Sequence, residues 1–268
     1  MGGENGTHPF ISWSGGDELV DMAPITHRIL LACDLDDTVV GDTEGERRFT
    51  QAVKRARDAG VLVLAYVTGR YLASGQRLVA EHDLPEPDWW GCDSGATVYR
   101  VADGGTLDLT GELSHGPWDA GIVRSRLAGH PALVPQDFDN LRRVSYIVTN
   151  VEPRAVVREV KGALAGMEVD VALVKDNCLD VLPAGLDKGV AVAFIAEHEG
   201  IPAGDVLVAG DSENDVPMLT GGFGRSVLVG NAEAYVKEAL HDKGVIVATT
   251  SHGTAVAGAL ESFISERI

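Results

Sequence analysis

Short, continuously apolar segments alternate with helix-forming segments along most of this 268-residue chain. Runs this short do not make helices, and their lack of polar alternation is typical of strands buried on both faces. The strand-like runs span 29–33, 61–67, 205–210 and 226–230. Helical patterns lie between them, at 43–60, 71–83 and 188–199. Parallel strands need such crossovers, so the alternation predicts an α/β fold with a doubly wound, Rossmann-like parallel sheet. We expect Thr43 to cap the first helix and Gly60 to end it.

The segment 103–182 has a different pattern and predicts an insert within that core. Apolar and polar residues alternate at 142–150, as in a sheet with one wet face. A helical pattern at 153–165 precedes two further strand-like segments, 167–176 and 178–183. Strands on both sides of a helix indicate an α+β unit with an antiparallel sheet.

These patterns divide the chain into a leader, a core and an inserted cap. Residues 28–102 and 183–268 are expected to form the core, and residues 103–182 the α+β cap. Residues 1–27 lack the basic start and apolar run of a signal peptide, so we expect a flexible polar leader. No apolar stretch approaches the ~18 residues of a membrane span. The three cysteines have no close spacing, which suits reduced thiols, and we expect a cytoplasmic protein.

The formal net charge of −18 argues against a nucleic-acid partner, because phosphate backbones bind surfaces rich in Lys and Arg. A small anionic substrate is compatible with this charge where a local cation or a metal reverses the field. We therefore expect a small-molecule partner, with neither nucleic acid nor membrane. The sequence predicts no oligomeric state.

Polar residues follow three of the predicted parallel strands. Asp34 and Asp36 come directly after 29–33, Thr68 follows 61–67, and Asp211 follows 205–210. In open parallel sheets, ligands bind beyond the carboxyl ends of the strands. A polar residue at the end of one strand is easily explained as a turn residue. Here the same explanation would have to apply at three separate strand ends. The pattern therefore predicts one shared site.

The residue types at this site suit phosphoryl transfer. Clustered carboxylates bind hard cations, and Mg²⁺ accepts one or two carboxylates together with substrate phosphate. Asp34 can serve as ligand and nucleophile, while Asp36 can give or take a proton. Lys188, the Thr68 hydroxyl and the backbone N–H groups at Gly69 can hold the oxygens of a phosphoryl group. We therefore expect Mg²⁺ as the cofactor.

Four segments resemble, in order and spacing, the motifs of the haloacid dehalogenase superfamily of phosphatases. They are "DLDDTVVG", "VTGR", Lys188 in "GLDKG", and "GDSENDVPML". The segments "LAYVTGRYLAS", "EPDWWGCDSGATVY", "DVLPAGLDKGVA" and "SHGTAVAGALESF" more closely resemble bacterial sucrose-phosphate phosphatases. The resemblance covers essentially the whole chain after residue 28. It implies Mg²⁺-dependent hydrolysis of a sugar phosphate.

The resemblance also implies roles for individual residues. Asp34 would form an aspartyl-phosphate, and Asp36 would protonate the departing sugar oxygen and then activate water. The implied metal ligands are Asp34, the backbone carbonyl of Asp36, Asp211 and, in support, Asp215. The implied phosphate-binding residues are Thr68, Gly69, Lys188 and Asn214. Asp37 stands where the family usually has Gly or Asn, and we interpret it as a turn residue.

The insert corresponds in position to a cap that recognises the leaving group. Candidate sugar contacts are Arg143, Tyr146, Lys175 and Asp176 on the cap, with Arg70 and Gln76 from the core. His252 is expected to be a helix-capping or surface residue. Sucrose 6-phosphate is the default substrate by resemblance, and other mono-, di- or pseudosaccharide phosphates suit the same scaffold. A phosphosugar mutase of the same superfamily and a non-catalytic phosphate-receiving or sugar-binding protein are the alternatives.

Overall fold

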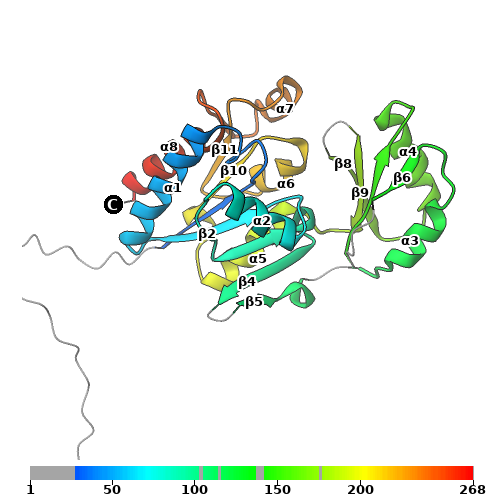
Figure 1. The fold of residues 1–268 in the computed structure, drawn as a ribbon, viewed down its shortest axis with the longest axis horizontal. Helices are drawn as coiled ribbons and strands as arrows, with labels where there is room; N and C mark the ends of the chain where they lie inside the picture. The colour runs from blue at the N-terminus through cyan, green and yellow to red at the C-terminus, as the bar shows by residue number, and fades with distance from the viewer. Residues whose placement is uncertain (1–27, 103–104, 114–115, 137–141, 175–176, 268) are drawn as a thin grey trace, which may run out of the picture.

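The computed structural model describes residues 28–102, 105–113, 116–136, 142–174 and 177–267. The predicted leader lies outside these residues. The chain forms two units that lie side by side, each built around its own sheet (Figure 1). The strands of the larger sheet are β1 (Ile29–Cys33), β2 (Leu62–Val67), β3 (Trp89–Cys92), β4 (Thr97–Ala102), β5 (Gly105–Asp108), β10 (Val206–Gly210), β11 (Arg225–Leu228) and β12 (Ile246–Val247). Among the described residues, their spatial order is β12-β11-β10-β1-β2-β3-β4-β5.

The centre of the larger sheet is parallel, as the alternating pattern predicts. β1 lies between β10 and β2 and pairs in parallel with both. At one edge, β4 and β5 pair antiparallel as successive hairpins. Because β5 belongs to this sheet, the larger unit extends beyond residue 102, where the sequence predicted the insert to begin.

Helices cover both faces of the larger sheet. One face carries α1 (Thr43–Asp58), α2 (Leu72–Glu81) and α8 (His252–Ser265), and the other carries α5 (Lys188–Glu199), α6 (Val216–Leu219) and α7 (Ala234–Leu240). Side chains of β1 alternate between these layers, so Leu31 packs in the cluster of Phe49 while Leu30 packs with Ile195. Burial on both sides explains the continuously apolar strands. Within the described residues, no helix combines the length and apolarity needed to cross a bilayer.

The N-cap of α1 lies one residue before the predicted one. Asp42, not Thr43, is the N-cap, and its Oδ1 accepts a hydrogen bond of 2.7 Å from the backbone N–H of Gly45. Thr43 is already the first helical residue. The helix ends at Asp58, and Gly60 follows with a φ of +72°, which a glycine adopts without steric cost.

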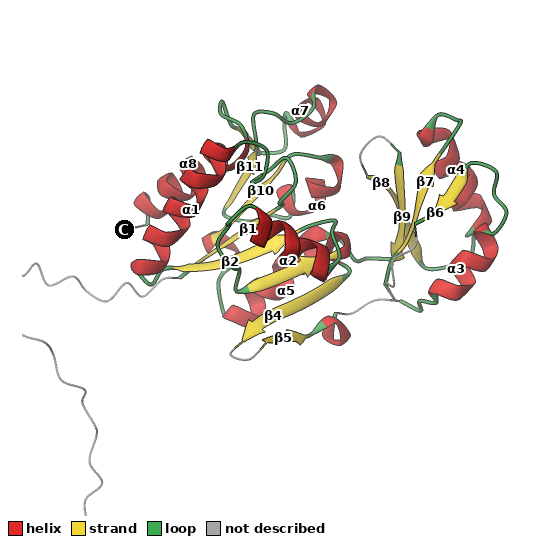
Figure 2. Cartoon of the chain, in the orientation of Figure 1, coloured by secondary structure: helices red, strands yellow, loops and turns green. Residues whose placement is uncertain are grey.

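The smaller unit, called the insert from here on, consists of the elements from α3 to β9. These are α3 (Ala120–Leu127), β6 (Leu133–Pro135), β7 (Val144–Val148), α4 (Pro153–Ala163), β8 (Val169–Val174) and β9 (Cys178–Pro183). Its antiparallel sheet has the order β6-β7-β9-β8 within the described residues. Both helices lie on the outer side of this sheet, and its other face is turned toward the larger unit (Figure 2). The predicted α+β insert is confirmed.

The predicted wet face of β7 is wrong. Val144, Tyr146 and Val148 pack against the insert's own helices, as the alternation predicts. On the opposite face, however, Ser145 and its cross-strand partner Asp180 are also buried. Their polar side chains face the contact with the larger unit instead of solvent.

Candidate active site

The carboxyl ends of β1, β2 and β10 bring the predicted polar residues together. The backbone N–H of Asp34 donates to the carbonyl of Ala209 at 3.0 Å, which extends the pairing of β1 and β10 by one residue. Asp211 follows β10 directly, and Thr68 follows β2. Carboxylate oxygens of Asp34, Asp211 and Asp215 lie within 4.8 Å of one another. We call these three residues the acid cluster.

Lys188 lies inside the acid cluster as the first residue of α5. It is fully buried, and its Nζ is 2.6 Å from Asp215 Oδ1 and 3.0 Å from Asp34 Oδ1. Burial alone would lower the pKa of this lysine, but the charges of Asp215 and Asp34 outweigh it and raise the pKa above its ordinary value. Lys188 is therefore a permanent cation beside Asp34.

One lysine does not neutralise three carboxylates. Burial raises the pKa of Asp34 from 3.8 to about 7, a shift opposed by Lys188 and reinforced by Asp215 and Asp36. Burial, with repulsion from Asp215 and Asp34, raises the pKa of Asp211 from 3.8 to about 8. A site with excess negative charge and oxygen donors from separate segments fits a hard divalent cation such as Mg²⁺. Asp34, Asp211 and Asp215 are the residues that would hold it.

Asp215 also organises the loop after β10. Its Oδ2 accepts hydrogen bonds of 2.9 Å from the backbone N–H groups of Asp211 and Ser212, at the start of the short 3₁₀ helix η4 (Glu213–Asp215). Its other oxygen accepts from Lys188. Thr38, which the sequence analysis did not single out, donates its hydroxyl to Asp211 Oδ1 at 2.8 Å. These bonds hold Asp211 within the acid cluster.

The carboxylate of Asp36 is held by Arg70 in a two-pronged ion pair. Arg70 Nε lies 2.7 Å from Asp36 Oδ2, and Nη2 lies 2.7 Å from Oδ1. Such fork-to-fork pairing fixes the orientation of a carboxylate as well as its position. The side chain of Asp36 is thus not part of the acid cluster. Arg70 therefore pairs with Asp36, and its predicted contact with the sugar stays a prediction.

Two of the candidate phosphate-binding residues, Thr68 and Asn214, lie next to Gly69. A Cβ at Gly69 would lie 3.6 Å from Asn214 Nδ2 and 3.7 Å from Ser94 Oγ, so these side chains face its backbone. The backbone N–H of Arg70 donates to Thr68 Oγ1 at 3.2 Å. Ser94 was missed by the sequence analysis, although it follows β3 at the same edge of the sheet. It is buried with a φ of +58° within the 3₁₀ turn η1 (Asp93–Gly95).

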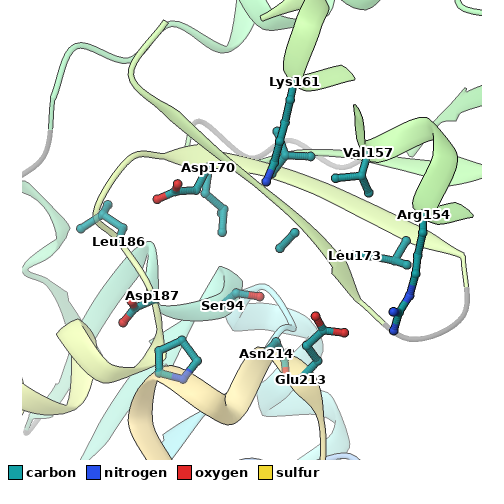
Figure 3. A pocket seen from close by; sticks show the side chains of 14 residues that line it. Ser94, Arg154, Val157, Lys161, Asp170, Leu173, Leu186, Asp187, Glu213 and Asn214 are labelled. Carbon is teal, nitrogen blue, oxygen red and sulfur yellow. The ribbon is translucent and has the colours of Figure 1, made fainter. Parts of the chain in front are cut away.

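A cavity of about 460 Å³ opens between the two units next to these residues. Its lower wall in Figure 3 includes Ser94, Asn214 and Glu213 of the larger unit. Lys161 and Arg154 extend into it from α4 of the insert (Figure 3). A smaller cavity of about 230 Å³, also lined by Asn214, reaches Asp211 of the acid cluster.

The predicted sugar contacts have different outcomes. Tyr146 is only 3% exposed and packs among apolar side chains on the helix-covered face of the insert, so the structure does not bring it to the cavity. Arg143 is buried between the two units. Gln76 lines a separate cavity of about 490 Å³, together with Tyr71. Lys175 and Asp176 lie outside the described residues.

Asp37 and His252 both take part in contacts between segments of the larger unit. Asp37 has a φ of +59°, and its carbonyl accepts from Asn231 Nδ2 at 2.6 Å, in agreement with its interpretation as a turn residue. His252 is the first residue of α8, and its Nδ1 lies 3.3 Å from Asp42 Oδ2. The loop before α1 and the start of α8 are thereby joined.

Comparisons with known proteins agree with this geometry. Residues 27–264 match the model of the family Sucrose-6F-phosphate phosphohydrolase. A mannosylfructose-phosphate phosphatase of Agrobacterium fabrum is 31% identical over 209 residues, which cover 76% of this chain and 83% of that protein. A probable sucrose-phosphatase of Arabidopsis thaliana is 28% identical over 221 residues, covering 77% of this chain and 51% of that protein.

The solved sucrose-phosphatase of Synechocystis, in complex with sucrose and phosphate, superposes with a TM-score of 0.78 at 29% identity. The match covers 89% of this chain and 98% of that one. These relatives are phosphatases of sugar phosphates. The cluster of carboxylates with a lysine, and the cavity between the larger unit and the insert, fit the same activity. The chain belongs to the sucrose-6F-phosphate phosphohydrolase family of haloacid dehalogenase-like hydrolases and is a sugar-phosphate phosphatase.

Proposed function

We propose that this protein is a Mg²⁺-dependent phosphatase that hydrolyses a disaccharide phosphate through an aspartyl-phosphate on Asp34. The observation that carries the proposal is the contact of buried Lys188 with Asp34, inside a cluster of carboxylates at the sheet edge that faces the insert. When bound there, Mg²⁺ supplies the positive charge that lets an anionic carboxylate approach an anionic phosphoryl group.

The residues present account for both half-reactions. Asp34 attacks phosphorus and the bond from phosphorus to the sugar oxygen breaks. At this step Asp36 carries a proton, and so accepts from Arg70 through one oxygen only, and it donates that proton to the sugar oxygen. Asp36 then accepts a proton from water, whose oxygen attacks the phosphoryl group and releases inorganic phosphate and free Asp34. Thr68 and Lys188 bind the phosphoryl oxygens in both steps.

The cavity between the two units supports a disaccharide as the leaving group. Its volume of about 460 Å³ lies within the range of about 300–1,000 Å³ of small-molecule sites. Its wall mixes cations, Arg154 and Lys161, with the acids Asp170 and Glu213. Such a lining offers both donors and acceptors to the hydroxyl groups of a neutral sugar. The names of the two relatives, mannosylfructose-phosphate phosphatase and sucrose-phosphatase, agree on a disaccharide and differ in which one.

A phosphate-release screen over mono- and disaccharide phosphates tests this function. In the presence of Mg²⁺ we expect the highest kcat/KM among disaccharide phosphates, with sucrose 6-phosphate and mannosylfructose phosphate in the panel. Conversion of a sugar phosphate to its isomer without phosphate release would instead show a mutase. Absence of both reactions would reject the enzymatic proposal. The cytoplasmic location and the lack of a nucleic-acid partner stay predictions.

A further inference from the structure

Arg143 of the insert is buried in the contact between the two units. The side chain is 6% exposed. Its Nη1 donates to the backbone carbonyl of Gly69 and lies 3.3 Å from Asp180 Oδ2 on β9, and its Nη2 lies 3.3 Å from Asp93 Oδ1. Asp180 also accepts a hydrogen bond from Ser145. The guanidinium therefore joins one group of the insert to two groups of the larger unit.

Burial of a cation is costly unless charged and hydrogen-bonding partners surround it. Here, the set of partners is complete only when the insert lies against the larger unit. Separation of the two units would leave Arg143 with Asp180 and remove Gly69 and Asp93. The contact therefore favours one closed arrangement, and the energy that it contributes depends on that arrangement.

The carbonyl that Arg143 binds belongs to a peptide group that also touches the phosphate-binding residues. The Gly69–Arg70 peptide accepts from Arg143 through its C=O, and its N–H donates to Thr68 Oγ1 at 3.2 Å. Because a peptide group is planar, fixing its oxygen also fixes the direction of its N–H. The Thr68 hydroxyl accepts from this N–H and so keeps its own proton available for a phosphoryl oxygen. The side chain that follows, Arg70, holds Asp36.

We propose that Arg143 is a positioning residue through which closure of the insert orders the Thr68–Gly69–Arg70 loop for phosphoryl transfer. It acts through the Gly69–Arg70 peptide and does not recognise the sugar. For its effect on catalysis, this inference rests on the proposed phosphatase function. The sequence suggested a sugar contact for Arg143, and the structure places its guanidinium against the Gly69 carbonyl, between Asp93 and Asp180.

The test compares Arg143→Gln with Arg158→Gln, a matched loss of charge on the exposed side of α4. The substrates are p-nitrophenyl phosphate, whose leaving group is small, and the best sugar phosphate from the screen. We expect Arg143→Gln to lower kcat/KM about 10- to 100-fold, by the same factor for both substrates, because the defect lies on the phosphoryl side. Arg158→Gln should stay within about 2-fold. Arg143→Lys, which keeps the charge but loses the planar guanidinium, should fall between wild type and Arg143→Gln.

A double-mutant cycle with Thr68→Val separates positioning from general support of the fold. If Arg143 acts through the Thr68 hydroxyl, Arg143→Gln should lower activity much less in the Thr68→Val background than in wild type. Additive losses would contradict the proposal. A loss confined to the sugar phosphate would also contradict it, because Arg143 would then recognise the leaving group. An unchanged kcat/KM of Arg143→Gln on both substrates would contradict it as well.

Hydrogen–deuterium exchange gives a readout that does not depend on activity. In the full-length protein without substrate, the backbone amides of residues 68–70 should exchange faster in Arg143→Gln than in wild type or Arg158→Gln. Circular dichroism verifies that each variant is folded. If wild type releases no phosphate, the proposed function fails, and the exchange data still decide whether Arg143 orders the loop. Unchanged exchange would reject the inference.

Discussion

At the residue scale, the chemistry depends on which carboxylates lie together and which are kept apart. Asp34, Asp211 and Asp215 share one buried space with Lys188, whereas Asp36 is turned toward Arg70. A nucleophile next to a permanent cation and a carboxylate held separately by an arginine can have different roles although both are aspartates. Residue type alone does not distinguish them.

Replacing Asp34 tests the nucleophile. Asp34→Asn keeps the size of the side chain but removes the carboxylate that attacks phosphorus, so phosphate release should fall to background while the circular-dichroism spectrum stays unchanged. Glu44→Gln, on the exposed first turn of α1, is the matched control and should keep wild-type turnover. Measurable turnover by Asp34→Asn would refute the assignment.

Replacing Arg70 tests the ion pair with Asp36. Arg70→Lys keeps a charge but loses the planar fork, and Arg70→Gln loses both, so the orientation of Asp36 is progressively released. We expect kcat to fall in the order wild type, Arg70→Lys, Arg70→Gln, by about 10-fold or more for the last variant. The measurement is steady-state phosphate release at saturating substrate. If instead only KM for the sugar phosphate rises, Arg70 contacts the sugar, as the sequence suggested.

At the element scale, single capping side chains set where helices begin. The side chain of Asp42 caps α1, and Lys188 occupies the first position of α5, capped by Asp187. These two helices lie on opposite faces of the sheet. A helix start next to the carboxyl end of a strand places its first residues beside the ligand, which is how Lys188 reaches Asp34.

The N-cap of α1 makes a stability prediction with its own control. Asp42→Ala removes the acceptor for the Gly45 N–H and should lower the free energy of unfolding by about 1 kcal/mol. Asp42→Asn keeps an acceptor and should lose much less. Thr43→Ala, at the position predicted from the sequence to be the cap, should be nearly neutral. Urea denaturation followed by circular dichroism measures all three, and a larger loss in Thr43→Ala than in Asp42→Ala would contradict the observed cap.

At the scale of the whole molecule, the site is formed by segments far apart in the chain and by two units. Asp34 and Asp211 come from the segments before and after the insert and meet because β1 and β10 are neighbours. The insert then covers the site from one side and leaves a cavity that both units line. Folding thus brings carboxylates from distant segments into one buried space. The free energy of unfolding therefore depends on the charge of these carboxylates.

This link predicts how pH and metal affect unfolding. In the metal-free protein, the folded-state pKa values of Asp34 and Asp211 are about 7 and about 8, above the ordinary value of 3.8. Groups with raised pKa values contribute stability at low pH that is lost as pH rises through the folded values. Thermal unfolding in EDTA should therefore occur at lower temperature at about pH 8 than at about pH 6.

Mg²⁺ should raise the unfolding temperature more at the higher pH, because it stabilises the ionised carboxylates. Asp211→Asn removes one of these acids and should reduce both the pH dependence in EDTA and the effect of Mg²⁺. Equal Mg²⁺ shifts in the two proteins would argue against a metal site at the acid cluster.

EDTA should also abolish phosphate release, and Ca²⁺ should fail to restore it because its larger, looser coordination shell misplaces the phosphoryl group.

Sequence alone was sufficient for the parallel core and for the shared position of Asp34, Thr68, Lys188 and Asp211. Buried strands are continuously apolar, and their carboxyl ends meet at one edge, so linear order already predicts which residues converge. The same reasoning predicted the α+β insert, because its alternation and helix differ from the core.

Only the tertiary structure decided which groups several of the predicted side chains contact, and to which sheet one strand belongs. Arg70 binds Asp36, Arg143 binds Gly69 across the two units, Tyr146 is a core residue of the insert, and β5 belongs to the larger sheet. Periodicity specifies the face of a strand on which a side chain lies, but it cannot specify what another part of the chain places against that face. That choice depends on contacts between distant segments, which exist only once the insert and the core are folded against each other.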